Sequence, residues 1–435
     1  MDMTTTPIAK LLFKLSPPVM LALLIQSIYN IVDSFFVARY SPEGLTALSI
    51  IYPMQLLMTA LATGTGAGVN LLISRMDGEG ETAKQATVMT NGLLLNVIHF
   101  LLFALCGIAL SPTYFHLSSN NETVCRLGII YAKMIFGGSF GLFVESICTK
   151  ILQARGNMML PMLAQVVGAG INVLLDPILI FGYAGMPKMG IAGAAVASIA
   201  GQWSAMAITL IAVMRTYHIR GKADRNMCCR IYQNGIGSIA TQSLYTLYII
   251  GLNMILKLFT EDAVTVLGIY YKVQSFFFIP LLGFQQVLLP VISNNFGARQ
   301  AERIKQIVKF SMLLSSGLML AAMLIFLLFP QALLSIFTSK QTMMDIGTYA
   351  FRVIALSFIP AGITIVITSY LQGITKMRAS VFVIVLRQVF LLVPLAFVLH
   401  FIGLKAVWWT FPITEVIAAF VCLIFEKKYR NFITR

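Results

Sequence analysis

The sequence predicts an all-α integral membrane protein whose twelve transmembrane helices form two bundles of six. Three observations predict this fold class: an apolar composition, apolar runs of bilayer length along the whole chain, and an internal repeat. Of the 435 residues, 58% are hydrophobic and 11% are charged, whereas soluble domains usually carry about 25% charged residues. We therefore expect the chain to lie in a lipid bilayer.

The apolar runs are long enough to cross a bilayer, which takes about 20 helical residues. They are also too long and too uniformly apolar for the strands of a membrane barrel, so we expect helices. The expected spans cover roughly residues 16–40, 45–73, 87–111, 127–153, 158–183, 189–214, 231–258, 263–294, 306–329, 346–372, 378–401 and 404–425.

Lysine and arginine residues are concentrated in alternate loops. With twelve spans, the loops on the side of the two termini hold 21 of the 31 basic residues, and the loops on the other side hold 6. An excess of this kind is typical of cytoplasmic loops. We therefore expect a multi-pass protein of the cell membrane with both termini cytoplasmic. The formal charge of +15 then reflects topology, and no nucleic acid partner is expected.

Short matches between the two halves share one displacement. The segment "ALSIIYPMQ" at 47–55 is similar to "VLGIYYKVQ" at 266–274, and "ISRMDG" at 73–78 is similar to "ISNNFG" at 292–297, each 219 residues apart. Paired bundles of one topology are common in secondary transporters, where the substrate site lies between the halves. We expect an N-terminal lobe at 1–214, a cytoplasmic linker at 215–230 and a C-terminal lobe at 231–435. A duplication in a channel or membrane enzyme is the alternative.

Carboxylates inside the expected spans are candidates for function, because a charged residue there costs about 2.5 to 3.5 kcal/mol on insertion scales. Asp33 shares a helical face with Gln26, and Asn172 shares one with Asp176, which lies four residues later. Two further acids lie nearer to span ends, and the sequence leaves open whether their role is structural or functional. They are Glu145 and Glu415.

Asp33, Asn172 and Asp176 offer the oxygen ligands that a hard cation such as Na⁺ prefers, and a pair of acids also suits proton carriage. A polar network that only joins the first and fifth spans is the alternative. The repeat weighs against this alternative, because a structural need would be expected in both halves. The corresponding residues of the second half are Leu252, Leu391 and Leu395.

Cations inside the spans show the opposite bias. Lys272 and Arg387 lie in the second half, and the corresponding residues of the first half are Pro53 and Gly168. The two lobes are therefore chemically unlike. The four histidines show no metal-ligand spacing, and no serine or cysteine has a recognisable catalytic arrangement. We expect no enzyme, no cofactor, and no metal other than Na⁺ at the cation-binding set.

Several motifs together resemble the multidrug and toxic compound extrusion (MATE) family. They are "PPVMLALLIQSIYNIVDSFFVAR" in the first span, "ISRMDGEG" after the second, "LQARGN" after the fourth, "NVLLDP" in the fifth and "GIAGAAVASIAGQ" in the sixth. The resemblance covers essentially the whole chain. It implies a two-lobed transporter that exports amphipathic, often cationic, compounds in exchange for H⁺ or Na⁺.

The resemblance also implies the branch of the family whose cation site lies in the N-terminal lobe. The pattern of that branch falls on Asp33, Asn172 and Asp176, with Gln26 nearby, Ser198 as a hydroxyl ligand of the sixth span and Pro18 as the bending residue of the first. No acid lies inside the seventh or tenth span, where another branch carries its acids. We expect gating at Pro17 and Pro18, and substrate binding by Tyr29, Gln55, Lys272, Gln274 and Arg387.

The expected function is a cation-coupled antiporter for multidrug efflux that works by alternating access as a monomer in the bilayer. Both H⁺ and Na⁺ stay open as the coupling ion. The alternative is a flippase or exporter of lipid-linked or anionic amphiphiles, which Lys272 and Arg387 favour.

Overall fold

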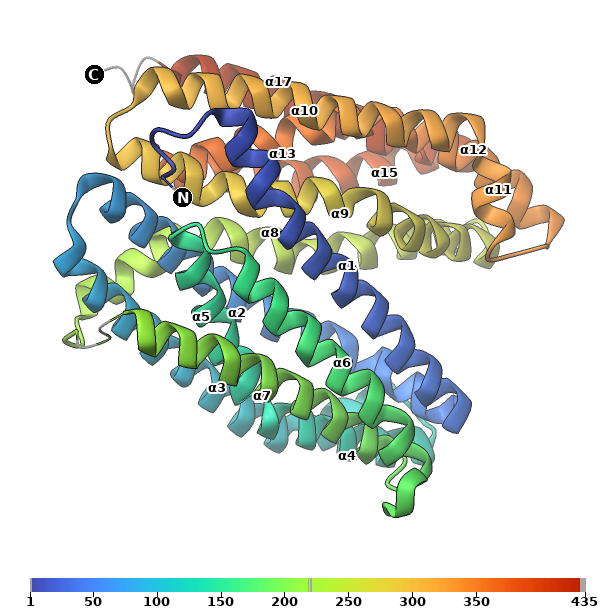
Figure 1. Ribbon diagram of the computed structural model, residues 1–435. Coiled ribbons are helices and arrows are strands. Elements are labelled where there is room, and N and C mark those ends of the chain that lie inside the picture. Colours follow the sequence, from blue (N-terminus) through green and yellow to red (C-terminus); the bar gives the residue numbers. More distant parts are fainter. Residues whose placement is uncertain (1, 218, 220, 431–435) are drawn as a thin grey trace. The chain divides into compact units, whose positions relative to one another are not determined.

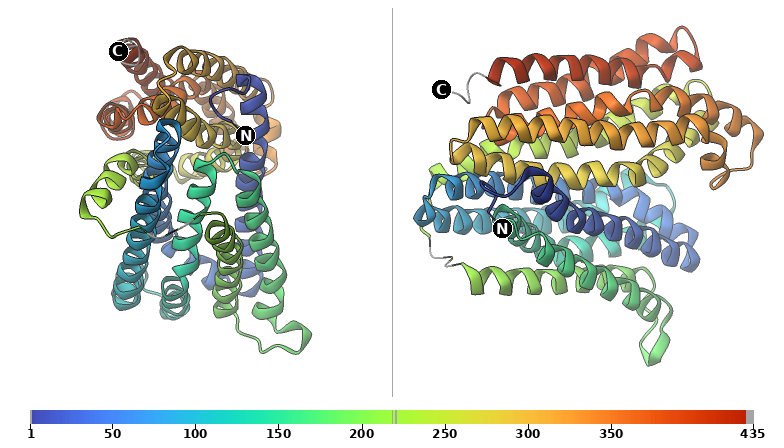
Figure 2. Two further views of the ribbon diagram at one scale, coloured as in Figure 1. Left: turned by 60° about the vertical axis from the view of Figure 1, so that its left-hand side comes forward. Right: turned by 45° about the horizontal axis from the view of Figure 1, so that its top comes forward.

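The computed structural model describes residues 2–217, 219 and 221–430, and most of them lie in helices (Figures 1 and 2). Residues 218 and 220 of the expected linker lie outside the described residues. The helices of the first half are α1 (Ile8–Tyr40), α2 (Pro42–Glu79), α3 (Thr82–Ser118), α4 (Glu122–Gly138), α5 (Phe140–Ala154), α6 (Met159–Phe181), the 3₁₀ turn η1 (Tyr183–Gly185) and α7 (Ile191–Thr216). Those of the second half are α8 (Arg225–Lys257), α9 (Glu261–Gly297), α10 (Ala301–Leu328), α11 (Pro330–Ser335), α12 (Gln341–Ala355), α13 (Phe358–Gly373), α14 (Met377–Val385), the π-helical turn η2 (Leu386–Leu391), α15 (Leu392–His400), α16 (Leu404–Val407) and α17 (Thr410–Arg430).

Ten candidate spans in the described chain are long and apolar enough to cross a membrane, and counting each of two bent helix pairs as one span gives twelve. The pair α4 and α5 bends by 44°, and the pair α12 and α13 bends by 45°. The bends follow Gly138 and Ala355, which lie within two residues of corresponding positions in the repeat. The all-helical membrane fold is confirmed, and the two bends are added to it.

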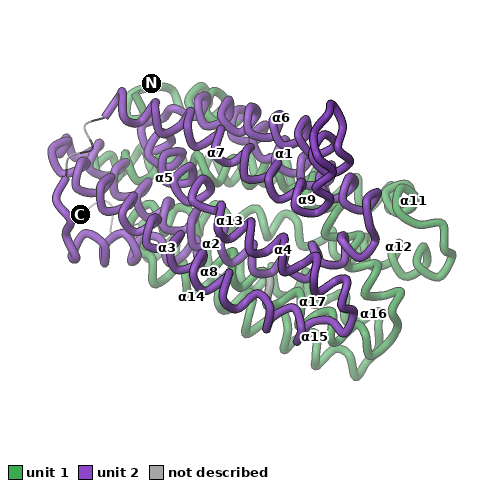
Figure 3. Tube along the Cα trace, turned by 90° about the horizontal axis from the view of Figure 1, so that it is seen from below, with its two compact units in different colours: residues 1–16, 240–435 green, residues 17–239 purple. Residues whose placement is uncertain are grey.

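The chain forms two compact units (Figure 3). Unit 1 comprises residues 1–16 and 240–435, and unit 2 comprises residues 17–239. Each division falls inside a helix, between Ser16 and Pro17 of α1 and between Ile239 and Ala240 of α8. The lobes expected at 1–214 and 231–435 are defined by the repeat rather than by packing, and that division stays a prediction.

In unit 2, α5 packs against α2, α3 and α7. Its side chains Ile147, Cys148 and Ile151 have no exposed surface. The corresponding helix of unit 1, α13, packs against α9, α10 and α17. The helix that follows the bend is therefore an inner helix of its unit in both halves.

The glycines of α2 allow a close helix crossing. A Cβ atom at Gly64 would lie 2.2 Å from Cγ1 of Ile239, and one at Gly68 would lie 2.1 Å from the carbonyl oxygen of Ile231. Small residues four apart let two membrane helices approach closely. Since α2 continues without a break through this segment, the glycines serve packing against the first turns of α8.

Aromatic rings form the core of unit 1 around Phe326. Its ring centroid lies 5.0 Å from that of Phe358, 5.2 Å from that of Phe351 and 6.2 Å from that of Tyr270. Such pairs contribute about 0.5–1.5 kcal/mol each beyond their buried area. These contacts join α9, α10, α12 and α13 and so fix the frame that carries the other side chains of unit 1.

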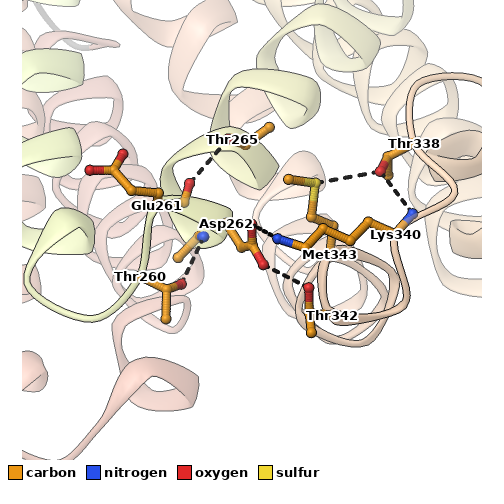
Figure 4. Close-up of polar contacts among 9 residues, drawn as sticks. Thr260, Glu261, Asp262, Thr265, Thr338, Lys340, Thr342 and Met343 are labelled. Atoms are coloured by element: carbon orange, nitrogen blue, oxygen red, sulfur yellow. Dashed lines mark hydrogen bonds and ion pairs between the residues drawn. The ribbon is translucent and has the colours of Figure 1, made fainter.

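Polar contacts fix the first turn of α9 to the start of α12 (Figure 4). The hydroxyl of Thr260 caps α9 by accepting a hydrogen bond from the Ala263 amide at 3.1 Å. Asp262 accepts hydrogen bonds from Lys340 at 2.7 Å and from the Thr342 hydroxyl at 2.6 Å. One carboxylate therefore holds two segments of unit 1 together.

Within unit 1, the N-terminal segment is also fixed to α9 and α10. The carbonyl oxygen of Met3 accepts a hydrogen bond from Asn295 Nδ2 at 3.1 Å and another from Arg303 Nη2 at 3.1 Å. Arg303 also donates to the carbonyl oxygen of Thr6. The side chain of Met3 is 4% exposed, so residues before α1 are part of the packed unit.

Candidate functional site

The closest contact between α6 and α7 lies one turn from Asn172. A Cβ atom at Gly168 would lie 2.7 Å from the carbonyl oxygen of Gly201, and one at Gly201 would lie 2.5 Å from that of Gly168. Only glycine at both positions allows this approach. The small residues of "GIAGAAVASIAGQ" thus bring the polar side chains of α6 and α7 within reach of each other.

Asn172 lies at the centre of the polar cluster in unit 2. Its Nδ2 atom donates to Asp176 Oδ1 at 3.5 Å and to Ser198 Oγ at 3.3 Å. Asn172 is 2% exposed and Asp176 is fully buried. The structure therefore brings together three of the five residues expected to bind a cation.

Three buried oxygen atoms of this cluster accept no hydrogen bond within the described chain. They are Asp33 Oδ1, Asn172 Oδ1 and Asp176 Oδ2. Asp33 comes from α1, and its charge interacts directly with that of Asp176. The cluster therefore combines two carboxylates and an amide oxygen, and these three oxygen atoms receive no hydrogen bond from the described residues.

Tyr131 of α4 belongs to the same cluster, although the sequence did not single it out. Its side chain is 3% exposed, and it interacts with the charges of Asp33 and Asp176 and with the side chain of Gln55. The repeat offered one signal, because the corresponding residue of the second half is Ala350. Tyr29 of α1 interacts electrostatically with Asp33 and Glu145.

Glu145 has polar neighbours on its own helix. Its Oε1 atom accepts a hydrogen bond from the Thr149 hydroxyl at 2.6 Å, and its charge interacts with that of Lys150. Because Tyr29 is also near, Glu145 lies at the border of the Asp33 cluster. These contacts give Glu145 a local structural partner.

Gln26, Pro17 and Pro18 lie on α1 before the cluster. Gln26 is half-buried and forms no hydrogen bond with the other cluster residues in the described chain. Pro17 is exposed and Pro18 is buried, and α1 continues as a helix through both. The division between the two units falls just before Pro17.

The remaining residues expected to bind substrate divide between the units. Tyr29 and Gln55 lie in unit 2, and Lys272, Gln274 and Arg387 lie in unit 1. Lys272 is exposed on α9, and no acidic side chain pairs with it in the part of the chain that the structure describes. Arg387 forms an ion pair with Glu415, with Nε 2.6 Å from Oε1.

A cavity of about 230 Å³ lies elsewhere in unit 2, between α2, α3 and α4. Its walls are apolar and include Ile51, Phe103 and Phe136. None of the expected site residues lines it. Because it lacks charged groups, this cavity suits hydrocarbon and offers no site for an ion.

The donor set of the unit 2 cluster fits a hard monovalent cation or a proton. Hard cations prefer oxygen ligands, and the cluster provides Asp33, Asn172, Asp176 and Ser198. Among the described residues, no group of three or more His, Cys, Asp or Glu side chains is arranged to hold a metal ion. The cluster therefore resembles an exchangeable ion site rather than a fixed transition-metal centre.

A family model described as MatE matches the chain twice, at residues 18–178 and 238–398. The matches begin at residues 18 and 238 and are thus displaced by 220 residues, close to the 219 expected from the repeat. Together they cover more than half of the chain.

Two curated relatives match nearly the whole chain. The FAD transporter of Shewanella oneidensis is 25% identical over 436 residues, which cover 98% of this chain and 95% of the relative. The multidrug export protein MepA of Staphylococcus aureus is 22% identical over 437 residues, which cover 99% of this chain and 96% of the relative.

A solved structure has the same fold. It is a MOP superfamily transporter from Pyrococcus furiosus, described as having a binding pocket of reverse polarity. Its TM-score is 0.92 at 22% identity, over 100% of this chain and 98% of that chain.

Proposed function

The chain belongs to the multidrug and toxic compound extrusion family, and we propose that it is an antiporter that couples inward flow of H⁺ or Na⁺ to export of amphipathic compounds. Members of this family are membrane transporters and not enzymes, so the multi-pass helical fold is that of a transporter. The proposal places the protein in the cell membrane with both termini cytoplasmic.

The observation that carries the proposal is the set of buried oxygens without donors in Asp33, Asn172 and Asp176. A buried polar group that lacks its partner costs about 1–3 kcal/mol. A bound Na⁺ would offset this cost at each oxygen that coordinates it, and a proton on one carboxylate would offset it at that oxygen and at the acceptor to which it is donated. The cluster therefore favours a state in which an ion is held there.

Coupling requires that the ion bind two conformations with different affinity. Asp33 is on α1, whereas Asn172 and Asp176 are on α6 and Ser198 is on α7. A movement of α1 at Pro17 and Pro18 would change the distance from Asp33 to the other ligands. Binding of H⁺ or Na⁺ would then favour one position of α1. Because α1 forms part of the wall of the N-terminal lobe, its movement would change the substrate site and release the substrate.

The test is flux into proteoliposomes that contain the purified protein. A cationic amphiphilic dye is the substrate, and a pH gradient and a Na⁺ gradient are imposed one at a time. Asp33→Asn and Asp176→Asn should each abolish gradient-driven flux, because each removes a charge from the ion site. Asp345→Asn is the matched control, since Asp345 is exposed and accepts a hydrogen bond only from Gln341 in the described chain. Full flux in both site variants would contradict the proposal.

A second candidate function is export of anionic or lipid-linked amphiphiles. It is favoured by Lys272, which is exposed and unpaired among the described residues, and by the name of the FAD transporter, because FAD is an anionic aromatic compound. Replacing the cationic dye with an anionic one in the same vesicles separates the two functions. Flux of the anionic dye alone would favour this second function.

A further inference from the structure

Arg387 lies at an interruption of the eleventh span. The span continues from α14 into the π-helical turn η2 and then into α15, and such turns occur frequently at functional sites. Arg387 is the second residue of η2. Its Nε atom lies 2.6 Å from Oε1 of Glu415 on α17, and the side chains are 23% and 7% exposed. The arginine is therefore held from one side by a buried acid.

The ion pair leaves most of the guanidinium unused. Arginine has five N–H donors, and only the one on Nε donates to a described residue. The terminal nitrogens retain their donors, and the side chain keeps part of its surface. A fork of this geometry binds carboxylate, phosphate and sulfonate groups with two parallel hydrogen bonds.

Three tyrosines of unit 1 lie beside this arginine. The ring centroids of Tyr245 and Tyr248 on α8 are 5.3 Å apart, and the ring centroid of Tyr271 on α9 lies 6.1 Å from Tyr245 and 6.4 Å from Tyr248. The charge of Arg387 acts on Tyr248 and Tyr271. Tyr245 is 39% exposed, so this tyrosine cluster of Tyr245, Tyr248 and Tyr271 is open on one side.

Two buried oxygens in the same region accept no hydrogen bond within the described chain. They are Oε2 of Glu415 and Oε1 of Gln388, and both residues are buried. Gln388 Nε2 donates to the carbonyl oxygen of Thr241, at 3.4 Å, one turn before Tyr245 on α8. Each such atom costs about 1–3 kcal/mol unless a donor such as water reaches it. Both atoms are acceptors, so they mark a polar region beside Arg387 and would not pair with an ionised acidic group.

An aromatic cluster by itself would also suit a cation, through the faces of its rings. The charges around this cluster decide against that. Glu415 is buried and already engaged by Arg387. Arg387 keeps 23% of its side chain exposed, whereas Glu415 keeps 7%. The accessible charge at the cluster is therefore that of Arg387, which disfavours a cation and favours an anion.

We propose that Arg387 and the tyrosine cluster form a subsite for a planar aromatic ring that carries an acidic group. The ring stacks on Tyr245, Tyr248 and Tyr271, and the acidic group accepts hydrogen bonds from the terminal nitrogens of Arg387. Glu415 is a positioning residue, because it fixes the guanidinium through Nε. This inference rests on the proposed transport function and names a substrate class for it.

Binding to the purified full-length protein in detergent, without any gradient, tests the subsite. Three probes are compared by equilibrium dialysis: 2-naphthoate, 2-naphthylmethylammonium, which keeps the ring and reverses the charge, and cyclohexanecarboxylate, which keeps the charge and lacks the aromatic ring. In the unaltered protein, 2-naphthoate should bind at least about tenfold more tightly than either of the other probes. Equal binding of the three probes, or tighter binding of the ammonium probe, would overturn the proposal.

Two variants separate the parts of the subsite. Arg387→Gln combined with Glu415→Gln removes both charges together, so that no buried charge is left unpaired, and it should erase the preference for 2-naphthoate over the ammonium probe. Tyr245→Leu should erase the preference over cyclohexanecarboxylate. Arg352→Gln is the matched control, because Arg352 is exposed in the same unit and donates to the carbonyl oxygen of Leu327. Retained preferences in the first two variants would refute the subsite.

The Asp33→Asn variant distinguishes failure of the subsite from failure of the coupling mechanism. Asp33 lies in unit 2, and binding is measured without a gradient. If Asp33→Asn loses flux and keeps selective binding of 2-naphthoate, both proposals stand. If Asp33→Asn and Asp176→Asn both keep flux and binding, the coupling mechanism fails and the subsite stands. If the unaltered protein lacks selective binding while flux depends on Asp33, the subsite alone fails.

Discussion

Adding a single methyl group at Gly201 should separate α6 from α7 and open the polar cluster. A Cβ atom there would lie 2.5 Å from the carbonyl oxygen of Gly168, and ordinary van der Waals contact begins at 3.4 Å. The helices must therefore move apart by the difference, about 0.9 Å. The bond from Asn172 Nδ2 to Ser198 Oγ is already 3.3 Å long, so the same movement would extend it beyond hydrogen-bonding distance.

The energetic cost follows from overpacking, which destabilises a protein by about 1–3 kcal/mol. Gly170→Ala is the matched control, because it lies on α6 beside the same crossing and an added Cβ atom would meet nothing within 4 Å. Both variants are heated in detergent, and the folded fraction is measured by size-exclusion chromatography. Gradient-driven flux is measured in proteoliposomes.

Gly201→Ala should unfold at a lower temperature than Gly170→Ala and should show weaker ion-driven flux. Ser198→Ala removes the acceptor of the Asn172 bond without moving the helices, so its flux shows how much of the loss comes from that bond alone. If Gly201→Ala equals Gly170→Ala in both stability and flux, the close crossing does not position the cluster, and the reasoning is refuted.

Four further predictions concern packing, the buried ion pair and the N-terminal segment, with two for that segment. Gly68→Ala should lower the free energy of unfolding by about 1–3 kcal/mol, because its Cβ atom would lie 2.1 Å from the Ile231 carbonyl oxygen. Gly317→Ala is the control, since its Cβ atom would meet nothing within 4 Å. Equal unfolding temperatures of the two variants would count against the crossing of α2 and α8. Arg387→Leu should destabilise unit 1 by about 3–5 kcal/mol, since it leaves Glu415 buried and unpaired, and adding Glu415→Leu should recover most of the loss in the same heating assay. A double variant no more stable than the single one would disprove this. Arg303→Met should increase amide hydrogen exchange in residues 3–6, because it removes the donors to Met3 and Thr6; unchanged exchange would show that other contacts hold the segment. Hydrogen bonds from Thr4 and Thr5 lower the pKa of Asp2 from 3.8 to about 2, so these contacts are stabilised above pH 3.8 and are lost as pH falls towards 2. The protection of the Thr4 amide against hydrogen exchange, corrected for the intrinsic exchange rate at each pH, should therefore be equal at pH 7 and pH 5.

The spans could be predicted because hydropathy depends only on composition along the chain. The bends after Gly138 and Ala355 were not expected, since each lies within one expected span, and the bends depend on how α5 and α13 pack inside their units. Taken alone, the glycines of α2 indicate a helix that can bend. In the structure they mark a crossing, because the identity of the neighbouring helix decides what a glycine does.

The sequence grouped Asp33 with Asn172 and Asp176 because they are acids and an amide in apolar spans, but it did not supply Tyr131. Asn172 and Asp176 lie four residues apart, so helical geometry alone puts them on one face. Tyr131 joins them from another span, and nothing in the order of the spans says that this residue of α4 interacts with Asp33 and Asp176. In the same way, the sequence gives no reason to pair Glu415 with Arg387, because their pairing depends on the packing of α17 against η2.

The order of synthesis delays the hydrogen bonds that hold the N-terminal segment within unit 1. Met3 leaves the ribosome before its partners Asn295 and Arg303, which follow 292 and 300 residues later. At about 5–20 residues per second, this delay is roughly 15–60 s. During that time the start of α1 lacks the carbonyl contacts that later hold it. The segment around Met3 thus waits for α9 and the start of α10 to be inserted before its contacts within unit 1 are complete.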